Sequence, residues 1–206
     1  MVLASASPRR RELLGAAGVS FELDPLPVDE DLAEFQDPSQ AALELALRKA
    51  LASARARARR GLVHELVLGA DTIVAVEDRS ARGQWRLLGK PADETEAHGM
   101  LQLLSGSRHQ VITGVCVVRT PDFVRWSAAE RTWVTMREIL PQEREAYVAS
   151  LEWRDKAGGY AIQEHADRFV TRLEEGGFDN VVGLPVQLTL ELLREAGAGL
   201  AGSPRP

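Results

Sequence analysis

Two stretches decide the fold class: HQVITGVCVVRT at residues 109–120 and FVRWSAAERTWVTMREI at residues 123–139. Both are rich in β-branched and aromatic residues, which favour extended backbone. They follow one another closely along the chain, so we predict two long neighbouring strands that pair with each other. Long neighbouring strands depart from a regular alternation of one strand and one helix, and they favour a mixed sheet.

Outside these stretches, extended and helical segments alternate. Extended segments are expected at residues 1–4, at 65–78 with a break near Gly69, and at 168–174. Helices are expected at residues 7–18, 37–60, 93–106, 141–153 and 184–197. We therefore predict an α/β protein in which helices cover both faces of a mixed sheet.

The first two expected helices carry clear start signals. Ser7 and Asp37 suit the N-cap position, and each precedes a proline at the first helical position. Gly18 suits the end of the first helix. The buried face of the second helix is expected to consist of Leu43, Leu47, Ala50, Leu51 and Ala54. Its basic end is expected to face solvent and comprises Arg55, Arg57, Arg59 and Arg60.

Length, charge and cysteine content limit the class of protein. The 206 residues, 45% of them apolar, suit one domain, expected at residues 1–197, followed by a flexible tail at 198–206. A formal net charge of −5 argues against a protein that coats nucleic acid. The single cysteine, Cys116, excludes an internal disulfide. Without a signal peptide or an apolar run of about 18 residues, we expect a soluble protein of a reducing compartment with no membrane partner.

Three consecutive arginines, Arg9, Arg10 and Arg11, fall in the first turn of the first expected helix. The helix dipole already places positive charge there, so further cations are unfavourable unless an anion lies opposite. Free backbone N–H groups point to the same place. A solvated basic turn is the simpler interpretation, but three arginines together favour an anion site. At about 100° per residue, Arg10 points to the buried face, Arg9 to its flank and Arg11 to solvent.

Two carboxylates and two lysines stand out further along the chain. Asp71 interrupts an apolar run, which is costly unless a metal, a cation or a reacting water meets it; a turn aspartate is the alternative. Glu30 lies in an acidic cluster, which taken alone is more typical of a solvated loop. Lys90 lies between a glycine and a proline, and Lys49 lies beside the apolar face. Together with the arginines they suit a polyphosphate with a divalent ion.

Eight short motifs then follow one another along the chain. They are SASPRR (5–10), VDE (28–30), RKA (48–50), GADT (69–72), GKP (89–91), SGSRHQVITGV (105–115), DKAGGYAIQ (155–163) and NVVGLPV (180–186). In this order they resemble the Maf family of nucleoside triphosphate pyrophosphatases. The resemblance spans residues 3 to about 196. It implies the α/β Maf/HAM1 (ITPase-like) fold with a central cleft between two lobes, a cytoplasmic location and a homodimer.

The resemblance also implies roles for individual residues. Asp71 corresponds to the catalytic aspartate, and Glu30 and Asp71 are the expected ligands of a divalent metal cation, Mg²⁺, Mn²⁺ or Co²⁺. The expected substrate-binding residues are Ser7, Arg9, Arg10, Lys49, Thr72, Lys90 and Gln163. Ser5 belongs to the same opening motif. The stretch AGGYAIQ, which ends at Gln163, resembles the branch that acts on dTTP and UTP rather than the branch that prefers 7-methyl-GTP.

The implied reaction splits a nucleoside triphosphate into the monophosphate and pyrophosphate by metal-assisted attack of water on the α-phosphorus. Asp71 either accepts the proton of the water or holds the metal, and both roles stay open. A glutamine amide offers an acceptor and donors to the edge of thymine or uracil. A nucleotide-binding regulator of cell division without turnover is the alternative function. An RNA-binding protein conflicts with the acidic charge and with only 5% aromatic residues.

Overall fold

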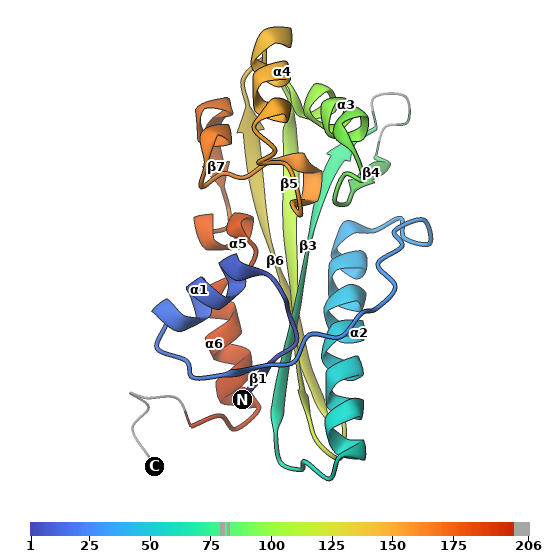
Figure 1. Cartoon of the computed structure of the whole chain (residues 1–206), viewed down its shortest axis with the longest axis vertical. Helices are drawn as coiled ribbons and strands as arrows, with labels where there is room; N and C mark the ends of the chain where they lie inside the picture. The colour runs from blue at the N-terminus through green and yellow to red at the C-terminus, as the bar shows by residue number, and fades with distance from the viewer. Residues whose placement is uncertain (79–80, 82, 200–206) are drawn as a thin grey trace.

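Three long antiparallel strands form the centre of the computed structural model, which describes residues 1–78, 81 and 83–199. β5 (Arg108–Arg119) pairs with β6 (Arg125–Met136) on one side and with β3 (Leu66–Glu77) on the other. The three strands run along the long axis of the molecule (Figure 1). The pairing of two neighbouring strands predicted from residues 109–139 is confirmed.

Short strands complete a seven-stranded sheet in the described part of the chain, in the order β2-β1-β3-β5-β6-β7 with β4 paired to β3. They are β1 (Val2–Leu3), β2 (Glu22–Leu23), β4 (Trp85–Leu88) and β7 (Val170–Glu174). β1 runs parallel to β2 and β3, and β4 and β7 are antiparallel to their partners. The mixed sheet is therefore confirmed. β2 and β4 were not predicted, because strands this short show no periodic pattern.

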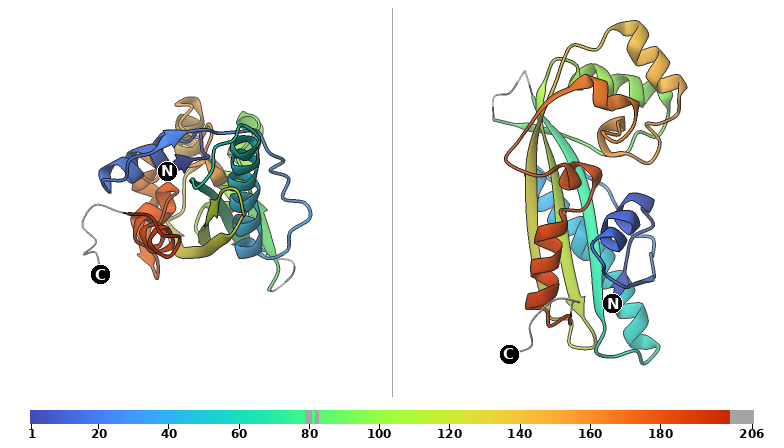
Figure 2. Two further views of the ribbon diagram at one scale, coloured as in Figure 1. Left: turned by 90° about the horizontal axis from the view of Figure 1, so that it is seen from below. Right: turned by 90° about the vertical axis from the view of Figure 1, so that its left-hand side faces the viewer.

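Helices cover both faces of the sheet, as predicted (Figure 2). α2 (Pro38–Arg59) packs along β3 and β5 on one face. The other face carries α1 (Pro8–Ala16), α5 (Phe178–Val182) and α6 (Val186–Glu195). At one end of the long strands lie α3 (Glu94–Leu104), α4 (Pro141–Ala149) and the 3₁₀ turns η1 (Ala157–Gly159) and η2 (His165–Phe169).

The predicted helices begin where their start signals place them. Asp37 accepts a hydrogen bond from the Gln40 N–H and so caps α2. Ser7 occupies the N-cap position of α1 with extended backbone, as predicted, although its side chain makes no capping hydrogen bond. No helix in the described ranges is both long and apolar enough to span a membrane. Residues 200–206 of the predicted tail, which was placed at residues 198–206, lie outside the described residues.

α2 lies very close to the sheet because two glycines face it. A Cβ atom would come within 2.3 Å of the Ala46 carbonyl oxygen at Gly69, and within 2.3 Å of the Ala42 carbonyl oxygen at Gly114. The buried face of α2 comprises Pro38, Ala41, Ala42, Leu45, Ala46, Lys49, Ala50, Ser53, Ala54 and Arg57. Leu43, Leu47 and Leu51 are only half-buried, so the prediction that these three leucines form the buried face is wrong. Close approach of the helix backbone selects small side chains over the most hydrophobic ones.

The same contact explains why β3 is not broken near Gly69. The ladder to β5 continues through it, with Gly69 opposite Cys116 and Asp71 opposite Gly114. A glycine within a strand marks either a break or the close approach of another segment, and here it marks the approach of α2. The predicted break is therefore wrong.

The basic end of α2 is only partly solvated. Arg55, Arg59 and Arg60 are exposed, but Arg57 is 2% exposed. Its guanidinium donates hydrogen bonds to Glu22, Asp24 and Glu65, and the bond to Glu65 is the main reason that its pKa is raised. Arg57 therefore ties α2 to β2 and to the start of β3, which corrects the prediction of a solvated side chain.

The outer edge of β3 is open over five residues. β1 pairs with β3 only at Val67 and Leu68, and β4 begins to pair at Val74. Between them, residues 69–73 pair only with β5 among the described strands. Side chains from both faces of β3 can therefore reach one opening at this edge.

Candidate active site

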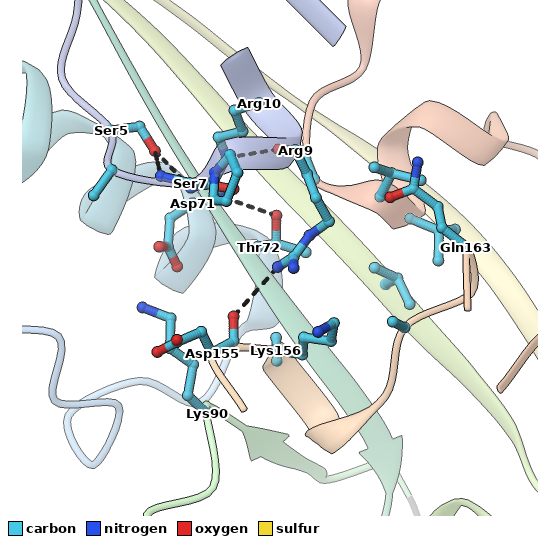
Figure 3. Close-up of a pocket in the computed structure, with 18 of the residues that line it drawn as sticks. Ser5, Ser7, Arg9, Arg10, Asp71, Thr72, Lys90, Asp155, Lys156 and Gln163 are labelled. Atoms are coloured by element: carbon cyan, nitrogen blue, oxygen red, sulfur yellow. Dashed lines mark hydrogen bonds between the residues drawn. The ribbon is translucent and has the colours of Figure 1, made fainter. Parts of the chain in front are cut away.

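A cleft of about 840 Å³ lies at this open edge, between α1 and the segment 154–164 (Figure 3). Its volume falls in the range of small-molecule sites, roughly 300–1,000 Å³. Each predicted site residue lines it: Ser7, Arg9, Arg10, Glu30, Lys49, Asp71, Thr72, Lys90 and Gln163. Asp71 and Lys90 lie on one side in Figure 3 and Gln163 on the other, with Arg9 between them.

Carboxylates and ammonium groups alternate along one wall. The Lys49 ammonium contacts the Asp71 carboxylate and lies 2.7 Å from Glu30, which also accepts a hydrogen bond from Lys90 at 2.8 Å. The side chains of Lys49 and Asp71 are 10% and 8% exposed. Burial raises the pKa of Glu30, but hydrogen bonds from the two lysines outweigh burial and lower its pKa to about 2. Glu30 is therefore ionised at neutral pH.

The close packing of α2 brings Lys49 and Asp71 together. Asp71 follows Gly69 by two residues and lies opposite Gly114, so its side chain points to the face of the sheet that α2 covers. Lys49 lies on the buried face of α2. The alternative interpretation of Asp71 as a turn residue is wrong, because Asp71 lies within β3. The interpretation of Glu30 as only a solvated loop residue is wrong as well, since both lysines bind it.

Arg10 is a buried cation that neutral oxygens hold. Its Nε donates to the Gly183 carbonyl at 2.7 Å, and its two terminal nitrogens donate to the Ser5 hydroxyl at 3.2 Å and the Thr72 hydroxyl at 3.0 Å. No carboxylate of the described residues lies within ion-pair distance of it. Burial lowers its pKa, and the charge of Asp71 opposes this effect. A guanidinium in this setting favours an incoming anion.

The other two arginines differ in exposure as predicted. Arg9 is half-buried, lines the cleft and donates to the Asp155 carbonyl oxygen at 3.2 Å. Arg11 is exposed and does not line the cleft. The orientation predicted for the three arginines is therefore confirmed: Arg10 points inward, Arg9 lies at the flank and Arg11 faces solvent.

Sequence reasoning missed two cations that line the cleft, Arg154 and Lys156. Lys156 lines it with a side chain that is 11% exposed, and its ammonium lies 3.6 Å from the Glu164 carboxylate. Gly158 and Gly159 both have positive φ and turn the chain at η1, just after this lysine. A lysine directly before a turn with two glycines, within a motif already singled out, was the signal that could have identified it.

Glu30 and Asp71 are the candidate ligands of a divalent ion in this cleft. The described residues contain no group of three or more His, Cys, Asp or Glu side chains placed to hold a metal. However, Glu30 and Asp71 converge on one point, the Lys49 ammonium, from two different segments. Two carboxylates together with phosphate oxygens and water form a typical Mg²⁺ environment, so the pair fits a metal that arrives with its substrate.

Comparison with known proteins identifies the family. The family model described as "Maf-like protein" matches residues 1–196. The chain belongs to the Maf family. Among its curated relatives, the "dTTP/UTP pyrophosphatase" of Bacillus cereus (strain AH820) is 44% identical over 95% of this chain and 94% of the relative. The protein of the same name from Bacillus anthracis (strain CDC 684 / NRRL 3495) is 43% identical over the same shares.

The Maf resemblance drawn from eight motifs is thereby confirmed over nearly the whole chain. One solved structure, a "Nucleoside-triphosphatase / dITP/XTP pyrophosphatase" from Mycobacterium abscessus, aligns with 96% of this chain and 98% of that protein. Its TM-score is 0.41 and its identity 16%, which is too weak a likeness to support an argument.

Proposed function

We propose that this Maf protein is a nucleoside triphosphate pyrophosphatase that converts dTTP and UTP to the monophosphate and pyrophosphate. One observation carries the proposal: the cleft combines a buried guanidinium, for which the described residues provide no carboxylate partner, with an adjoining row of carboxylates and lysines. The curated relatives named dTTP/UTP pyrophosphatase support the substrate class.

The two ends of the cleft suit the two ends of a nucleotide. Arg10 and Lys90 lie toward the end that also contains Asp71, where cations neutralise phosphate oxygens, and Arg9 lies between the two ends. Gln163 lies at the other end, where its amide pairs with the N3–H and a carbonyl of thymine or uracil. Arg10 has five N–H groups and uses three of them within the protein, which leaves one on each terminal nitrogen for phosphate oxygens.

The reaction forms a bond between a water oxygen and the α-phosphorus and breaks the bond from the α-phosphorus to the bridging oxygen. Pyrophosphate leaves with the electron pair, and the arginines and lysines stabilise its charge. Asp71 accepts the proton of the water or holds the metal. Lys49 lies between Asp71 and Glu30 and limits the repulsion between the two carboxylates. Burial of Asp71 and Lys49 keeps bulk water from screening these charges.

Glu30 and Asp71 are the residues that would hold a divalent cation, Mg²⁺, Mn²⁺ or Co²⁺. When bound, such an ion supplies positive charge that stabilises the phosphate oxygens and lowers the pKa of water. The carboxylates must then exchange part of their contact with Lys49 for the ion, which leaves the lysine ammonium available for a phosphate oxygen.

We also propose that residues 1–197 act as one unit with two lobes, because the lining of the cleft extends from Ala4 to Gly183. A cytoplasmic location follows from the proposed substrates, which are cytoplasmic metabolites. The homodimer and the absence of a nucleic-acid partner stay predictions.

The test is pyrophosphate release from a panel of nucleotides by the purified protein, with Mg²⁺, Mn²⁺ and Co²⁺ supplied separately. We expect release from dTTP and UTP above that from ATP, GTP and 7-methyl-GTP, and none in the presence of a chelator. Tight binding of dTTP without release would instead support the alternative, a nucleotide-binding regulator of cell division. Release from 7-methyl-GTP alone would overturn the assignment to the dTTP and UTP branch.

A further inference from the structure

A line of hydrogen bonds leads from Arg10 through the sheet to α5. The Arg10 guanidinium donates to Thr72 on β3, the Thr72 hydroxyl lies 2.9 Å from that of Thr113 on β5, and Thr113 donates to the Asn180 carbonyl oxygen at 3.0 Å. Thr113 and Asn180 are fully buried. Asn180 is fixed in turn by its side-chain amide, which donates to the Val111 carbonyl and the Thr132 hydroxyl.

The chemistry of the two ends determines the direction of every bond in this line. The guanidinium of Arg10 can only donate and the carbonyl of Asn180 can only accept. The Thr113 hydroxyl must therefore donate its hydrogen to the Asn180 carbonyl, so toward Thr72 it can act only as an acceptor. The Thr72 hydroxyl then donates its hydrogen to Thr113, and its oxygen accepts a hydrogen bond from Arg10. Any reversal would bring two lone pairs together in a buried site, which is costly.

This direction leaves Thr72 without a hydrogen to donate to a substrate. Ser5 differs, because its oxygen accepts from Arg10 and from the Ser7 N–H, and no acceptor for its hydroxyl hydrogen is found among the described residues. Both hydroxyls line the cleft, but only that of Ser5 is available as a donor to phosphate.

Two of the three hydrogen bonds of the guanidinium lead back to one short segment. Arg10 Nε donates directly to Gly183, which follows α5, and its terminal nitrogen reaches Asn180 in α5 through the two threonines. Gly183 has a φ of +126°, which favours glycine, and a Cβ there would lie 3.8 Å from Arg10 Nε. The guanidinium plane is therefore held at two points that move together with α5.

We propose that Thr113 is a positioning residue that acts through Thr72 to orient Arg10 for the phosphate groups. We call the line of hydrogen bonds from Arg10 through Thr72 and Thr113 to Asn180 the relay. Within it, the Thr72 hydroxyl accepts a hydrogen bond from Arg10 and does not bind the substrate. The inference rests on the proposed function, because it assigns Arg10 to the phosphates. It adds a residue that never reaches the cleft, since Thr113 does not line it.

The test combines three single variants with one double variant. Thr113→Val removes the hydroxyl at nearly constant volume, and Thr113→Ser keeps it. Thr189→Val removes an equally buried hydroxyl from α6, which bonds to the Pro185 carbonyl and not to the line from Arg10 to Asn180. We expect Thr113→Val to lower kcat/KM for dTTP by roughly tenfold, the scale for a hydrogen bond that positions a charged group. Thr113→Ser and Thr189→Val should both stay within about twofold of the parent.

The double variant decides whether Thr113 acts through Arg10. In the Arg10→Ala background, Thr113→Val should have little further effect on kcat/KM. An equal loss with and without Arg10, or a loss in Thr113→Ser that matches Thr113→Val, would overturn the inference. If the parent releases no pyrophosphate, the proposed function fails, and the relay is tested by calorimetric binding of inorganic triphosphate to the same proteins. Weaker binding by Thr113→Val that disappears in the Arg10→Ala background supports the relay, and unchanged binding overturns it.

Discussion

The charges of four side chains along one wall of the cleft sum to zero. Asp71 and Glu30 carry two negative charges, and Lys49 and Lys90 carry two positive charges, with contacts that alternate in sign. A row with no net charge gives a triphosphate little long-range attraction. The attraction must therefore come from the cations outside the row, Arg9, Arg10 and Arg154, for which no carboxylate partner is found among the described residues. The row itself supplies acid–base and metal chemistry.

Asp71→Asn tests the chemistry of this row. The neutral amide neither accepts a proton from water nor holds a metal well, so kcat on dTTP should fall by at least about 10²-fold. Thermal unfolding should report a folded protein. Asp122→Asn is the matched control, because Asp122 pairs with Arg119 on an exposed turn away from the cleft. Turnover by Asp71→Asn close to the parent, with the same metal requirement, would remove Asp71 from the reaction.

His109 makes stability depend on pH. Its Nε2 lies 3.0 Å from the Tyr160 hydroxyl and its Nδ1 lies 3.1 Å from Ser107, whose hydroxyl donates to the Leu104 carbonyl. Burial lowers the pKa of His109 to about 3. The unfolded chain therefore takes up this proton first, and the free energy of unfolding falls as pH drops from about 6.5 to about 3, by at most about 1.4 kcal/mol per pH unit.

The measurement is urea unfolding of the parent and of His109→Gln between pH 6.5 and 5. The variant is expected to be less stable at pH 6.5, because it loses a buried ring, but its stability should depend less on pH. His98→Gln, at a partly exposed position on α3, should keep the slope of the parent. Equal slopes in the parent and in His109→Gln would show that another group causes the pH dependence.

At the scale of elements, the three arginines in the first turn of α1 point in three different directions. The periodicity of the helix was sufficient to predict which arginine is buried, because Leu14 on the same face is fully buried. Periodicity could not predict that neutral oxygens from two distant segments, at Thr72 and Gly183, would hold Arg10 together with the nearby Ser5. Those contacts depend on how α5 and β3 meet α1.

The arginines should therefore differ in their effect on kcat/KM for dTTP. Arg10→Ala should cause the largest loss, Arg9→Ala a loss of roughly 10- to 100-fold, and Arg11→Ala almost none, since a hydrogen bond to a charged group contributes about 1.5–3 kcal/mol. Arg11→Ala is the matched control because it removes the same charge from the same turn. A loss at Arg11 equal to that at Arg9 would mean that the arginines act only as a diffuse positive field.

The contact between α2 and the sheet depends on Gly114. A Cβ there would lie 2.3–2.6 Å from backbone atoms of Ala42 and Leu43, which cannot turn aside. Gly114→Ala should therefore lower the free energy of unfolding by about 3 kcal/mol or more, at the upper end of overpacking effects. Gly99→Ala on the exposed face of α3, where a Cβ meets nothing within 4 Å, should instead raise stability by up to about 1 kcal/mol. Chemical denaturation compares the two, and equal effects would contradict the close contact.

For the whole molecule, local sequence predicted the elements better than their contacts. The long strands, the helix starts and the mixed sheet follow from propensity and periodicity, which act over a few residues. The break at Gly69 and the solvated Arg57 were wrong because both depend on what lies opposite in space. The open edge of β3, which puts Asp71 and Thr72 into one cleft, depends on where β1 ends and β4 begins. The charged site residues stood out because their local sequence disfavours them, but Ser7, Thr72 and Gln163 were predicted only from motif resemblance, which already contains such long-range constraints.

The length of the cleft allows base recognition and phosphate chemistry to be separated by one substitution. Gln163 lies across the cleft from Asp71 and Lys90, and its side chain is exposed (Figure 3). Gln163→Leu leaves the edge of thymine or uracil without its partner, so kcat/KM for dTTP and UTP should fall by about 10- to 100-fold, equivalent to about 1–3 kcal/mol. Hydrolysis of purine nucleotides and inhibition by inorganic triphosphate should barely change, because the phosphate end is untouched. Gln187→Leu on α6 is the matched control, since Gln187 bonds only to Glu191 among the described residues. An equal loss for every nucleotide would make Gln163 a structural residue and remove the pyrimidine preference from this end of the cleft.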